Sequence, residues 1–255
     1  MKALRWMSEI PFALLTLWLF IAFVGYVVVY GSLVLLIGWL IEKIAGKEKG
    51  KRYIEKEVAR FGRNAFRVIG ARVKAYNRDK VPKKGPMVII SNHQSTFDIP
   101  LVAGYVRGGI SFIAKAEISK IPAVAQFVKR LDGVFIERGN KLQTAGVIRT
   151  IMRILKNGGT IMLFPEGTRS LDGELKDFKK GSLVLPYRMK VPIVPVALDG
   201  TKDIMVKGKL LVKPAKVKLK VLDPVNPGEF ETEEELEKYL HTLIAEALLE
   251  LRRMG

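Results

Sequence analysis

Residues 87–100 read MVIISNHQSTFDIP, an apolar run followed by a polar loop and then by Ile99 and Pro100. The apolar run has the length of a buried strand, and proline is favoured in the first turn of a helix. The segment therefore predicts a strand, a short loop and a helix that begins close to Asp98. Because α/β proteins place their sites at the carboxyl ends of parallel strands, this loop is a candidate site.

The chain after residue 50 repeats this alternation of short apolar runs with helical patterns. Strands alternating with helices predict an α/β fold with a mostly parallel sheet flanked by helices on both faces. The apolar runs that predict strands are residues 87–91, 111–114, 133–136 and 160–164. The helices between them are expected to begin at Ile99, Pro122 and Leu142.

Three further patterns predict elements around this sheet. Apolar residues at spacings of four and three predict an amphipathic helix after residue 50, with Ile54, Val58, Phe61, Ala65 and Val68 on its buried face. Alternation of lysine with apolar residues over 216–221 predicts a strand with one face in water. The last helix is expected to open at Thr232, with Glu235 at capping-box spacing.

Composition limits the classes of protein and of site that need to be considered. The length of 255 residues suits one α/β domain with a small appendage. The formal net charge of +18 attracts anions such as nucleic acid, acidic lipid headgroups, cofactor phosphates or an acidic carrier protein. The absence of cysteine from the sequence excludes disulfides, thiolate metal sites and a cysteine nucleophile.

The N-terminal segment has the composition of a membrane anchor. Residues 10–41 contain no charged residue, and the run is too long for the apolar core of a secretory signal. As one straight helix it would be about 48 Å long, against about 30 Å of hydrocarbon. Gly25 and the Gly31-Ser32 pair therefore predict two short helices that fold back on each other, with a single crossing helix as the alternative.

Basic residues flank this segment on both sides, as a hairpin inserted from the cytoplasm would prefer. The sequence thus predicts a protein held at the cytoplasmic face of the cell membrane by residues 10–41. We expect residues 1–50 to form the membrane-anchoring helices and residues 51–255 to form the α/β domain.

The loop after residue 91 contains a base and a carboxylate. A neutral imidazole is a useful base near pH 7, and a carboxylate on its other nitrogen fixes the tautomer and stabilises the imidazolium. The spacing of His93 and Asp98 lets the loop bring them together. Asp98 could also cap the next helix, and His93 could be a structural histidine. The other histidine, His241, lies among the apolar positions of the last helix and is the weaker candidate.

A second polar segment, residues 164–170 with the sequence FPEGTRS, follows another apolar strand. Gly167 permits a sharp turn whose backbone amides can face an anion, and Arg169 can grip a phosphate with its guanidinium fork. Glu166 could hold that arginine or a substrate hydroxyl. Taken alone, the segment is more typical of a solvated turn than of a site.

Strand position indicates two more candidate residues, and a proline pattern marks one further segment. Lys115 and Arg138 each come after a predicted strand, which places two further cations at the same sheet edge, although each is also an ordinary surface residue. Residues 191–196 carry two prolines in a β-like run, which predicts an edge strand or a pocket wall.

Together these motifs resemble the glycerophosphate acyltransferase family, and most closely its 1-acylglycerol-3-phosphate acyltransferases. Its H-x-x-x-x-D block is similar to residues 93–98, and its second block, an apolar pair followed by a basic residue, is similar to residues 135–138. The F-P-E-G-T-R-S block is present in full at 164–170, and the fourth block resembles residues 191–196. The resemblance covers about residues 72–200.

The resemblance implies a catalytic pair, His93 and Asp98, beside a glycerophosphate site. It implies transfer of an acyl group from acyl-CoA or acyl carrier protein, as co-substrate, to lysophosphatidate at a lipid bilayer, giving phosphatidic acid without a metal or other cofactor. The residues implied for the glycerophosphate site are Arg138, Glu166, Gly167, Thr168 and Arg169, to which strand position adds Lys115.

Other functions remain open at this stage. The same motifs fit an enzyme that acylates the sn-1 hydroxyl of glycerol 3-phosphate, and the same pair could activate water in a hydrolase. A non-enzymatic module could use its basic face to bind anionic lipid. A nucleic-acid binder is disfavoured, because the charge is spread along the chain, no DNA-binding motif appears and residues 10–41 indicate a membrane.

Overall fold

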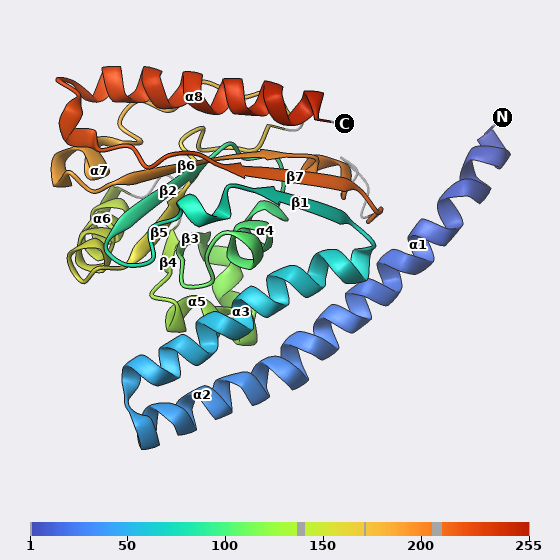
Figure 1. Cartoon of the computed structure of the whole chain (residues 1–255). Helices are drawn as coiled ribbons and strands as arrows, with labels where there is room; N and C mark the ends of the chain where they lie inside the picture. Colours follow the sequence, from blue (N-terminus) through green and yellow to red (C-terminus); the bar gives the residue numbers. More distant parts are fainter. Residues whose placement is uncertain (1, 137–140, 171, 206–210, 255) are drawn as a thin grey trace.

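The computed structural model describes residues 2–136, 141–170, 172–205 and 211–254 (Figure 1). The strands in these residues are β1 (Arg72–Tyr76), β2 (Met87–Ser91), β3 (Ser111–Lys115), β4 (Val134–Ile136), β5 (Thr160–Leu163), β6 (Ile193–Asp199) and β7 (Lys216–Val221). The α-helices are α1 (Lys2–Gly25), α2 (Gly31–Ala45), α3 (Lys47–Ile69), α4 (Asp98–Tyr105), α5 (Pro122–Arg130), α6 (Lys141–Lys156), α7 (Val184–Met189) and α8 (Glu233–Arg253).

The strands form one sheet in the order β1-β7-β6-β2-β5-β3-β4. Neighbouring strands are parallel except β6 and β7, so the predicted α/β fold with a mostly parallel sheet is confirmed. In the centre, Ile90 of β2 is level with Leu163 of β5 and with Pro195 of β6. The loops that follow β2, β5 and β6 therefore leave the sheet at the same edge.

Helices cover both faces of this sheet (Figure 1). Val88 and Ile90 of β2 belong to an apolar cluster that includes residues of α6 and α8, whereas Met87 and Ile89 belong to a second cluster with α3 and α4. All four side chains are at most 1 % exposed. A strand that is buried on both faces is apolar throughout, which is why its residues do not alternate with polar ones.

Helix α3 begins at Lys47, so the expected boundary at residue 50 falls inside its first turn. The expected buried face is only partly correct, because Val68 is 48 % exposed while Gly62 and Phe66 are buried. A Cβ atom on Gly62 would lie 2.8 Å from the backbone nitrogen of Gly104 in α4. This backbone contact between α3 and α4 turns the buried face toward Gly62.

The prediction that β7 has one wet face is wrong at its centre. Lys218 is only 8 % exposed, and its Nζ donates a hydrogen bond of 2.8 Å to the carbonyl oxygen of Leu251 in α8. Lys220 forms an ion pair with Glu250 of the same helix. Helix α8 covers this face of β7. The lysine residues tolerate this cover because their aliphatic stems pack beneath the helix while their ammonium groups reach the Leu251 carbonyl and the Glu250 carboxylate.

The prediction of an edge strand over 191–196 is also wrong, because β6 lies between β7 and β2. Pro195 occupies a gap in the pairing with β7, between the bridge of Ile193 to Val225 and the ladder that starts at Val196. A proline lacks the backbone N–H that a regular ladder needs, so it is tolerated at such an interruption.

The fold-back predicted near Gly25 and Gly31 is wrong. Both glycines have helical backbone angles, with φ of −60° and −61°, and Tyr26–Tyr30 between them forms a π-helical segment. A π-helical segment absorbs an irregularity without ending the helix. The chain instead reverses at Gly46, whose φ is +93°, and α3 then packs beside α2 (Figure 1).

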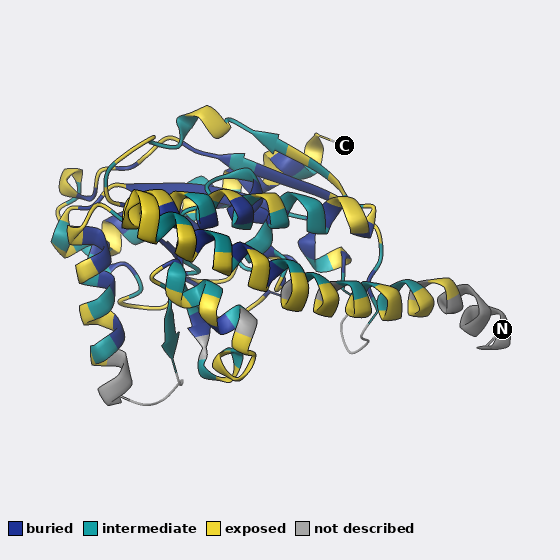
Figure 2. Ribbon diagram, turned by 90° about the horizontal axis from the view of Figure 1, so that it is seen from below, coloured by how far each residue is buried: buried dark blue, intermediate teal, exposed yellow. Residues whose placement is uncertain are grey.

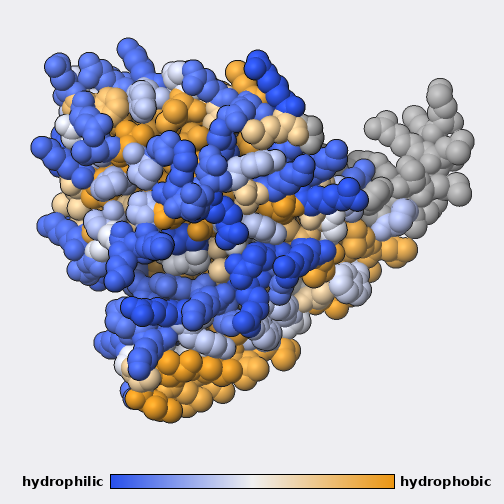
Figure 3. Space-filling model, viewed as in Figure 1, coloured by the Kyte–Doolittle hydropathy of each residue, from blue (hydrophilic) through white to orange (hydrophobic). Residues whose placement is uncertain are grey.

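The N-terminal helix, which runs through α1, the π-helical segment and α2, carries an exposed apolar surface. By length and composition one stretch, Val28–Ala45, could cross a membrane, and 17 % of it is buried, while Ala13–Ala22 is a shorter apolar helix. Residues coloured as exposed follow this helix in Figure 2, and apolar surface gathers along the lower edge of Figure 3. The exposed apolar residues include Leu14, Leu17, Trp18, Phe20, Ile21, Leu33, Leu36, Trp39 and Leu40.

Candidate active site

Three loops meet at the edge where β2, β5 and β6 end. They contain residues 92–98 after β2, residues 164–170 after β5 and residues 200–201 after β6. Hydrogen bonds join them directly, since His93 contacts Glu166 and Asp98 contacts Thr201. The parallel pairing of the three strands thus brings together polar residues that lie more than 100 positions apart.

The structure places His93 and Asp98 in contact, with 2.7 Å between Nδ1 and Oδ2. Asp98 is fully buried, and its Oδ2 also accepts the backbone N–H groups of Gln94, at 2.7 Å, and Ser95, at 2.9 Å. Its Oδ1 accepts the hydroxyl of Thr201. Four donors compensate the carboxylate for the loss of water.

This arrangement fixes the tautomer of His93. Because an ionised carboxylate only accepts hydrogen bonds, a neutral imidazole in this contact carries its ring proton on Nδ1 and keeps the lone pair of Nε2. Within the described residues Nε2 makes no hydrogen bond, and the side chain is 17 % exposed. Asp98 is the first residue of α4, and Phe97 is the N-cap. The Asp98 carboxylate therefore accepts hydrogen bonds from the histidine loop and does not cap the helix.

The position of the His93 ring is set by its surroundings. Phe164 stacks on it, with 3.9 Å between ring centroids and 17° between ring planes. The backbone N–H of His93 donates to Glu166 Oε1 at 2.8 Å, and its carbonyl accepts the N–H of Ser170 at 2.7 Å. The FPEGTRS loop therefore packs against the histidine and binds its backbone on both sides.

Glu166 has a different place from the one expected. It is 2 % exposed, and its two oxygens accept backbone N–H groups, Oε1 from His93 and Oε2 from Lys176 at 3.2 Å. Burial raises the pKa of the Glu166 carboxyl, and these two hydrogen bonds oppose that rise. Glu166 thus joins two loops and does not hold Arg169.

The turn at Gly167 is partly exposed and carries a basic residue, Arg169. Gly167 has a φ of +64°, and its N–H closes the turn onto the carbonyl of Phe164 at 2.9 Å. This left-handed backbone conformation favours glycine, and the flexible end of the Lys179 side chain lies over the turn. Thr168 and Arg169 are exposed, and in the described part of the chain the Arg169 guanidinium forms no ion pair.

Two expected site residues, Lys115 and Arg138, lie partly or wholly outside the described part of the structure. Lys115 ends β3, and its backbone is paired with Ile136 of β4, so it does lie at the edge where the site is. Its side chain lies outside the described part of the structure, as does all of Arg138.

Two contacts of the site were not predicted from the sequence. Thr201 was overlooked because a Gly-Thr pair after a strand is ordinary turn chemistry, although the strand-end rule that found His93 applies to it equally. Asn92 was given no role, yet its side-chain amide makes two hydrogen bonds of 2.8 Å to the backbone of Leu198. These bonds fasten the histidine loop to β6.

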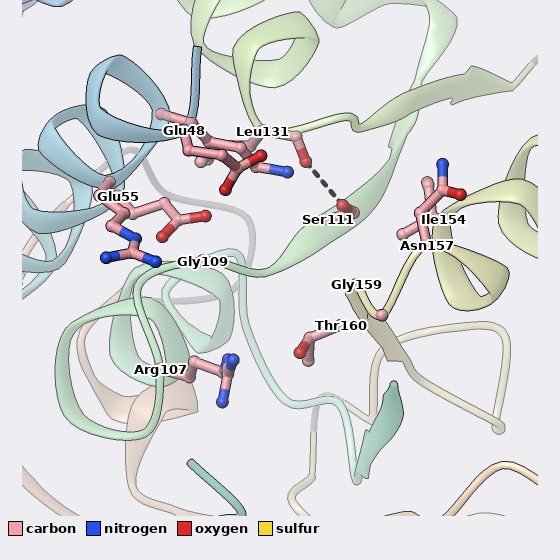
Figure 4. A pocket seen from close by; sticks show the side chains of 13 residues that line it. Glu48, Glu55, Arg107, Gly109, Ser111, Leu131, Ile154, Asn157, Gly159 and Thr160 are labelled. Carbon is pink, nitrogen blue, oxygen red and sulfur yellow. Dashed lines mark hydrogen bonds between the residues drawn. The ribbon is translucent and has the colours of Figure 1, made fainter. Parts of the chain in front are cut away.

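A cavity of about 190 Å³ lies at the opposite edge of the sheet (Figure 4). Thr160 and Ser111, which begin β5 and β3, line it together with Glu55 and Arg107. None of the candidate site residues lies on its wall. It is therefore separate from the histidine and aspartate pair.

The chain matches a known family over the region that contains this pair. Residues 72–199 fit a protein-family model described as acyltransferase. The chain belongs to the acyltransferase family. The matched residues of this acyltransferase hold all four sequence blocks, including the buried Asp98 and the loop that binds His93.

Individual relatives carry more specific names. The 1-acyl-sn-glycerol-3-phosphate acyltransferase of Cocos nucifera is 33 % identical over 170 residues, which are 65 % of this acyltransferase and 55 % of the relative. A probable enzyme of the same name from Mycoplasma pneumoniae is 33 % identical over 174 residues, 63 % of this chain and 64 % of that protein. The acyltransferase thus spans between half and two thirds of the length of these curated relatives.

A solved structure is similar over nearly the whole chain. The crystal structure of the 1-acyl-sn-glycerophosphate (LPA) acyltransferase PlsC from Thermotoga maritima has a TM-score of 0.88 and 38 % sequence identity. The similarity covers 96 % of this acyltransferase and 97 % of that chain, and so extends beyond the region of the family model.

Proposed function

We propose that this acyltransferase moves a fatty acyl group from an acyl thioester to the sn-2 hydroxyl of 1-acylglycerol 3-phosphate, giving phosphatidic acid. The observation that carries the proposal is the 2.7 Å contact of His93 with a buried carboxylate, beside the turn of residues 164–170 in which Thr168 and Arg169 are exposed. The names of the relatives and of the similar Thermotoga structure support the choice of acceptor.

In this proposal His93 acts as a general base. Its Nε2 removes the proton of the sn-2 hydroxyl while that oxygen attacks the thioester carbonyl carbon. The carbon–sulfur bond then breaks, and the departing thiolate takes the proton from the imidazolium. Asp98 stabilises the imidazolium between these two steps. General base catalysis of this kind contributes about 10² to 10⁴ in rate. A serine nucleophile is disfavoured, because the sequence has no G-x-S-x-G elbow.

The glycerophosphate is held by the basic turn. Arg169 and Arg138 bind its phosphate, while the backbone at Gly167 and Thr168 faces the same group and Lys115 adds charge nearby. Holding both substrates in register contributes about 7 to 11 kcal/mol at best. Glu166 acts indirectly in this scheme, since its two oxygens are occupied by backbone amides.

The remaining partners follow from charge and apolar surface. Acyl-CoA and acyl carrier protein both present anions, which the net charge of +18 attracts, so either serves as the acyl donor in the proposal. No metal or other cofactor is assigned a step. Residues 1–50 hold the enzyme on a lipid bilayer at the cytoplasmic face of the cell membrane, and residues 51–255 carry the catalytic machinery.

The test combines two histidine variants with a labelled acyl thioester. His93→Ala is expected to lose at least about 100-fold in turnover, because it removes the base. His241→Ala is the matched control and is expected to keep turnover within about twofold, since His241 lies in α8 and its ring packs against Phe178, with no contact to His93 or Asp98 among the described residues. Turnover of His93→Ala within a few fold of wild type would refute the general base.

The destination of the label separates the competing functions. The proposal expects the label in phosphatidic acid when lysophosphatidate is the acceptor. Label in free fatty acid would indicate a hydrolase, and preferential labelling of glycerol 3-phosphate would indicate an sn-1 acyltransferase. A protein that binds anionic vesicles but releases no thiol from the donor would be a lipid-binding module.

A further inference from the structure

The hydroxyl of Thr201 binds the buried side of the Asp98 carboxylate. Thr201 is fully buried, begins a short 3-10 turn after β6, and donates its hydroxyl hydrogen bond to Asp98 Oδ1. We propose that Thr201 is a positioning residue of the acyl transfer, whose hydroxyl keeps the carboxylate in the orientation that holds the His93 ring. This inference rests on the proposed function, because it concerns the same pair.

The two carboxylate oxygens of Asp98 accept different numbers of hydrogen bonds. Oδ2 faces the His93 ring and also accepts two backbone N–H groups, whereas within the described residues Oδ1 accepts only the hydroxyl of Thr201. Without that hydroxyl, Oδ1 would be a buried charged oxygen without a partner, which is costly. The carboxylate would then rotate or admit water, and either change moves the imidazole away from its set position.

The backbone leaves Thr201 little freedom to sit elsewhere. Gly200 has a φ of +88°, and a Cβ on it would lie 2.1 Å from the carbonyl oxygen of Lys216 at the start of β7. Only glycine can make this turn so close to the neighbouring strand. The turn directs the next residue back under the histidine loop, where its hydroxyl meets Asp98.

The segment that carries Thr201 is also held by the last helix. Arg252 of α8 donates from Nη2 to the carbonyl of Gly173 at 2.7 Å, and its Nε lies 3.8 Å from Asp199 Oδ1 at the end of β6. The same Gly173 carbonyl accepts a longer bond of 3.4 Å from Gln94 in the histidine loop. Helix α8 therefore holds the strand end that leads into the Thr201 turn.

The test uses four threonine variants and measures kcat and KM separately. Thr201→Val is expected to lower kcat about 10- to 100-fold, the usual effect of misplacing a catalytic group, with KM for lysophosphatidate unchanged within about twofold. Thr201→Ser keeps the hydroxyl and is expected to stay within about threefold of wild type. Thr160→Val is the matched control, since the Thr160 hydroxyl is also buried, has no hydrogen-bond partner among the described residues and lies at the opposite sheet edge.

Folding is controlled by circular dichroism and by the melting temperature of each variant. If Thr201→Val does not fold, the comparison passes to Thr201→Ala and Thr201→Ser, because alanine lacks the hydroxyl and serine retains it. A serine variant as impaired as the alanine variant would overturn the proposal. So would a folded Thr201→Val enzyme with the kcat of wild type.

A spectroscopic measurement separates this proposal from the general-base proposal. The chain has two histidines, so labelling histidine with ¹⁵N gives a simple spectrum in which the Nδ1 proton of His93 is identified by its loss in His93→Ala. Thr201→Val is expected to shift or broaden that signal, and Thr201→Ser to preserve it. An unchanged signal in Thr201→Val would overturn the positioning role, whereas an active His93→Ala enzyme would overturn the base instead.

Discussion

At the scale of single residues, the candidate site depends on carboxylates that are buried but fully hydrogen-bonded. Asp98 and Glu166 are both at most 2 % exposed, and both accept backbone N–H groups from the histidine loop. One carboxylate faces the imidazole, and the other holds the backbone N–H of the same residue. The geometry of His93 is therefore set from two loops that are remote in sequence.

Asp98→Asn should separate charge from shape at this pair. The asparagine amide is nearly the same size but carries no charge to stabilise the imidazolium. Its NH₂ group would also face an N–H or O–H group that now donates a hydrogen bond to the carboxylate. We expect kcat to fall about 10³- to 10⁴-fold, a range set by the corresponding aspartate of serine proteases. The exposed Asp223→Asn, which makes the same chemical change, is the control, and equal activity of the two variants would contradict the assignment.

Glu166→Gln tests the link between the two loops. Glutamine retains one acceptor oxygen, but its NH₂ group would face either the N–H of His93 or that of Lys176. We expect a loss of about 1 to 3 kcal/mol in the free energy of unfolding and a fall of about tenfold in kcat. Urea titration and steady-state rates measure both quantities. The exposed Glu229→Gln should change neither, and an unchanged urea midpoint in Glu166→Gln would show that the two bonds are dispensable.

At the scale of elements, glycines decide how closely the helices approach. A Cβ on Gly50 of α3 would lie 2.8 Å from the carbonyl of Gly38 in α2, and one on Gly62 would meet the backbone of Gly104 in α4. Helix α3 is thus packed by backbone contact against α2 near one end and against α4 near its middle. Such contacts leave no room for a methyl group.

Gly62→Ala should therefore destabilise the fold in spite of the better helix propensity of alanine. Its methyl group would lie 2.3 Å from the carbonyl of Pro100, and the helices would have to separate. We expect a loss of about 1 to 3 kcal/mol in the free energy of unfolding. Gly146→Ala in α6 is the matched control, because its Cβ would meet nothing within 4 Å, and it should stabilise by up to about 1 kcal/mol. Equal urea midpoints would contradict the close contact.

Elements differ in how far the sequence could predict them. β2, β3, β4 and β5 were predicted from apolar runs, which in β2 and β5 follow from burial on both faces of the sheet. β1 was missed, since its sequence RVKAY carries two charges at an edge of the sheet. His93 and Asp98 lie in one loop, so sequence spacing predicted their contact. The contact of Asp98 with Thr201 depends on β6 lying beside β2. It could not be predicted, because a single sequence does not determine the order of strands in a sheet.

At the scale of the whole molecule, charge and apolar surface are segregated. The net charge of +18 belongs largely to the α/β part, because residues 10–41 carry none of it, and the exposed apolar side chains follow the N-terminal helix. Figure 3 shows hydrophilic surface over most of the molecule and apolar surface along one side. This distribution supports the proposed membrane contact, in which the helix enters lipid and basic residues meet acidic headgroups.

Replacing Leu36 and Leu40 of α2 by lysine should weaken binding to lipid vesicles. Both side chains are exposed on one side of the helix, and each lysine in the hydrocarbon costs about 2.5 to 3.5 kcal/mol. We expect sedimentation with vesicles to fall at least about 100-fold, with turnover in detergent retained. The exposed Ile148→Lys on α6 serves as the control. Undiminished vesicle binding of the double variant would place the membrane contact elsewhere.

The two glycine contacts of α3 have a mechanical consequence. Helix α2 touches α3, and α3 touches α4, whose first residue is Asp98. In the proposed orientation, in which α2 lies in lipid, two closely packed helix interfaces connect the bilayer to the proposed acid–base pair. The proposal therefore expects the turnover rate to change with the thickness of the bilayer, because thickness sets the tilt of α2.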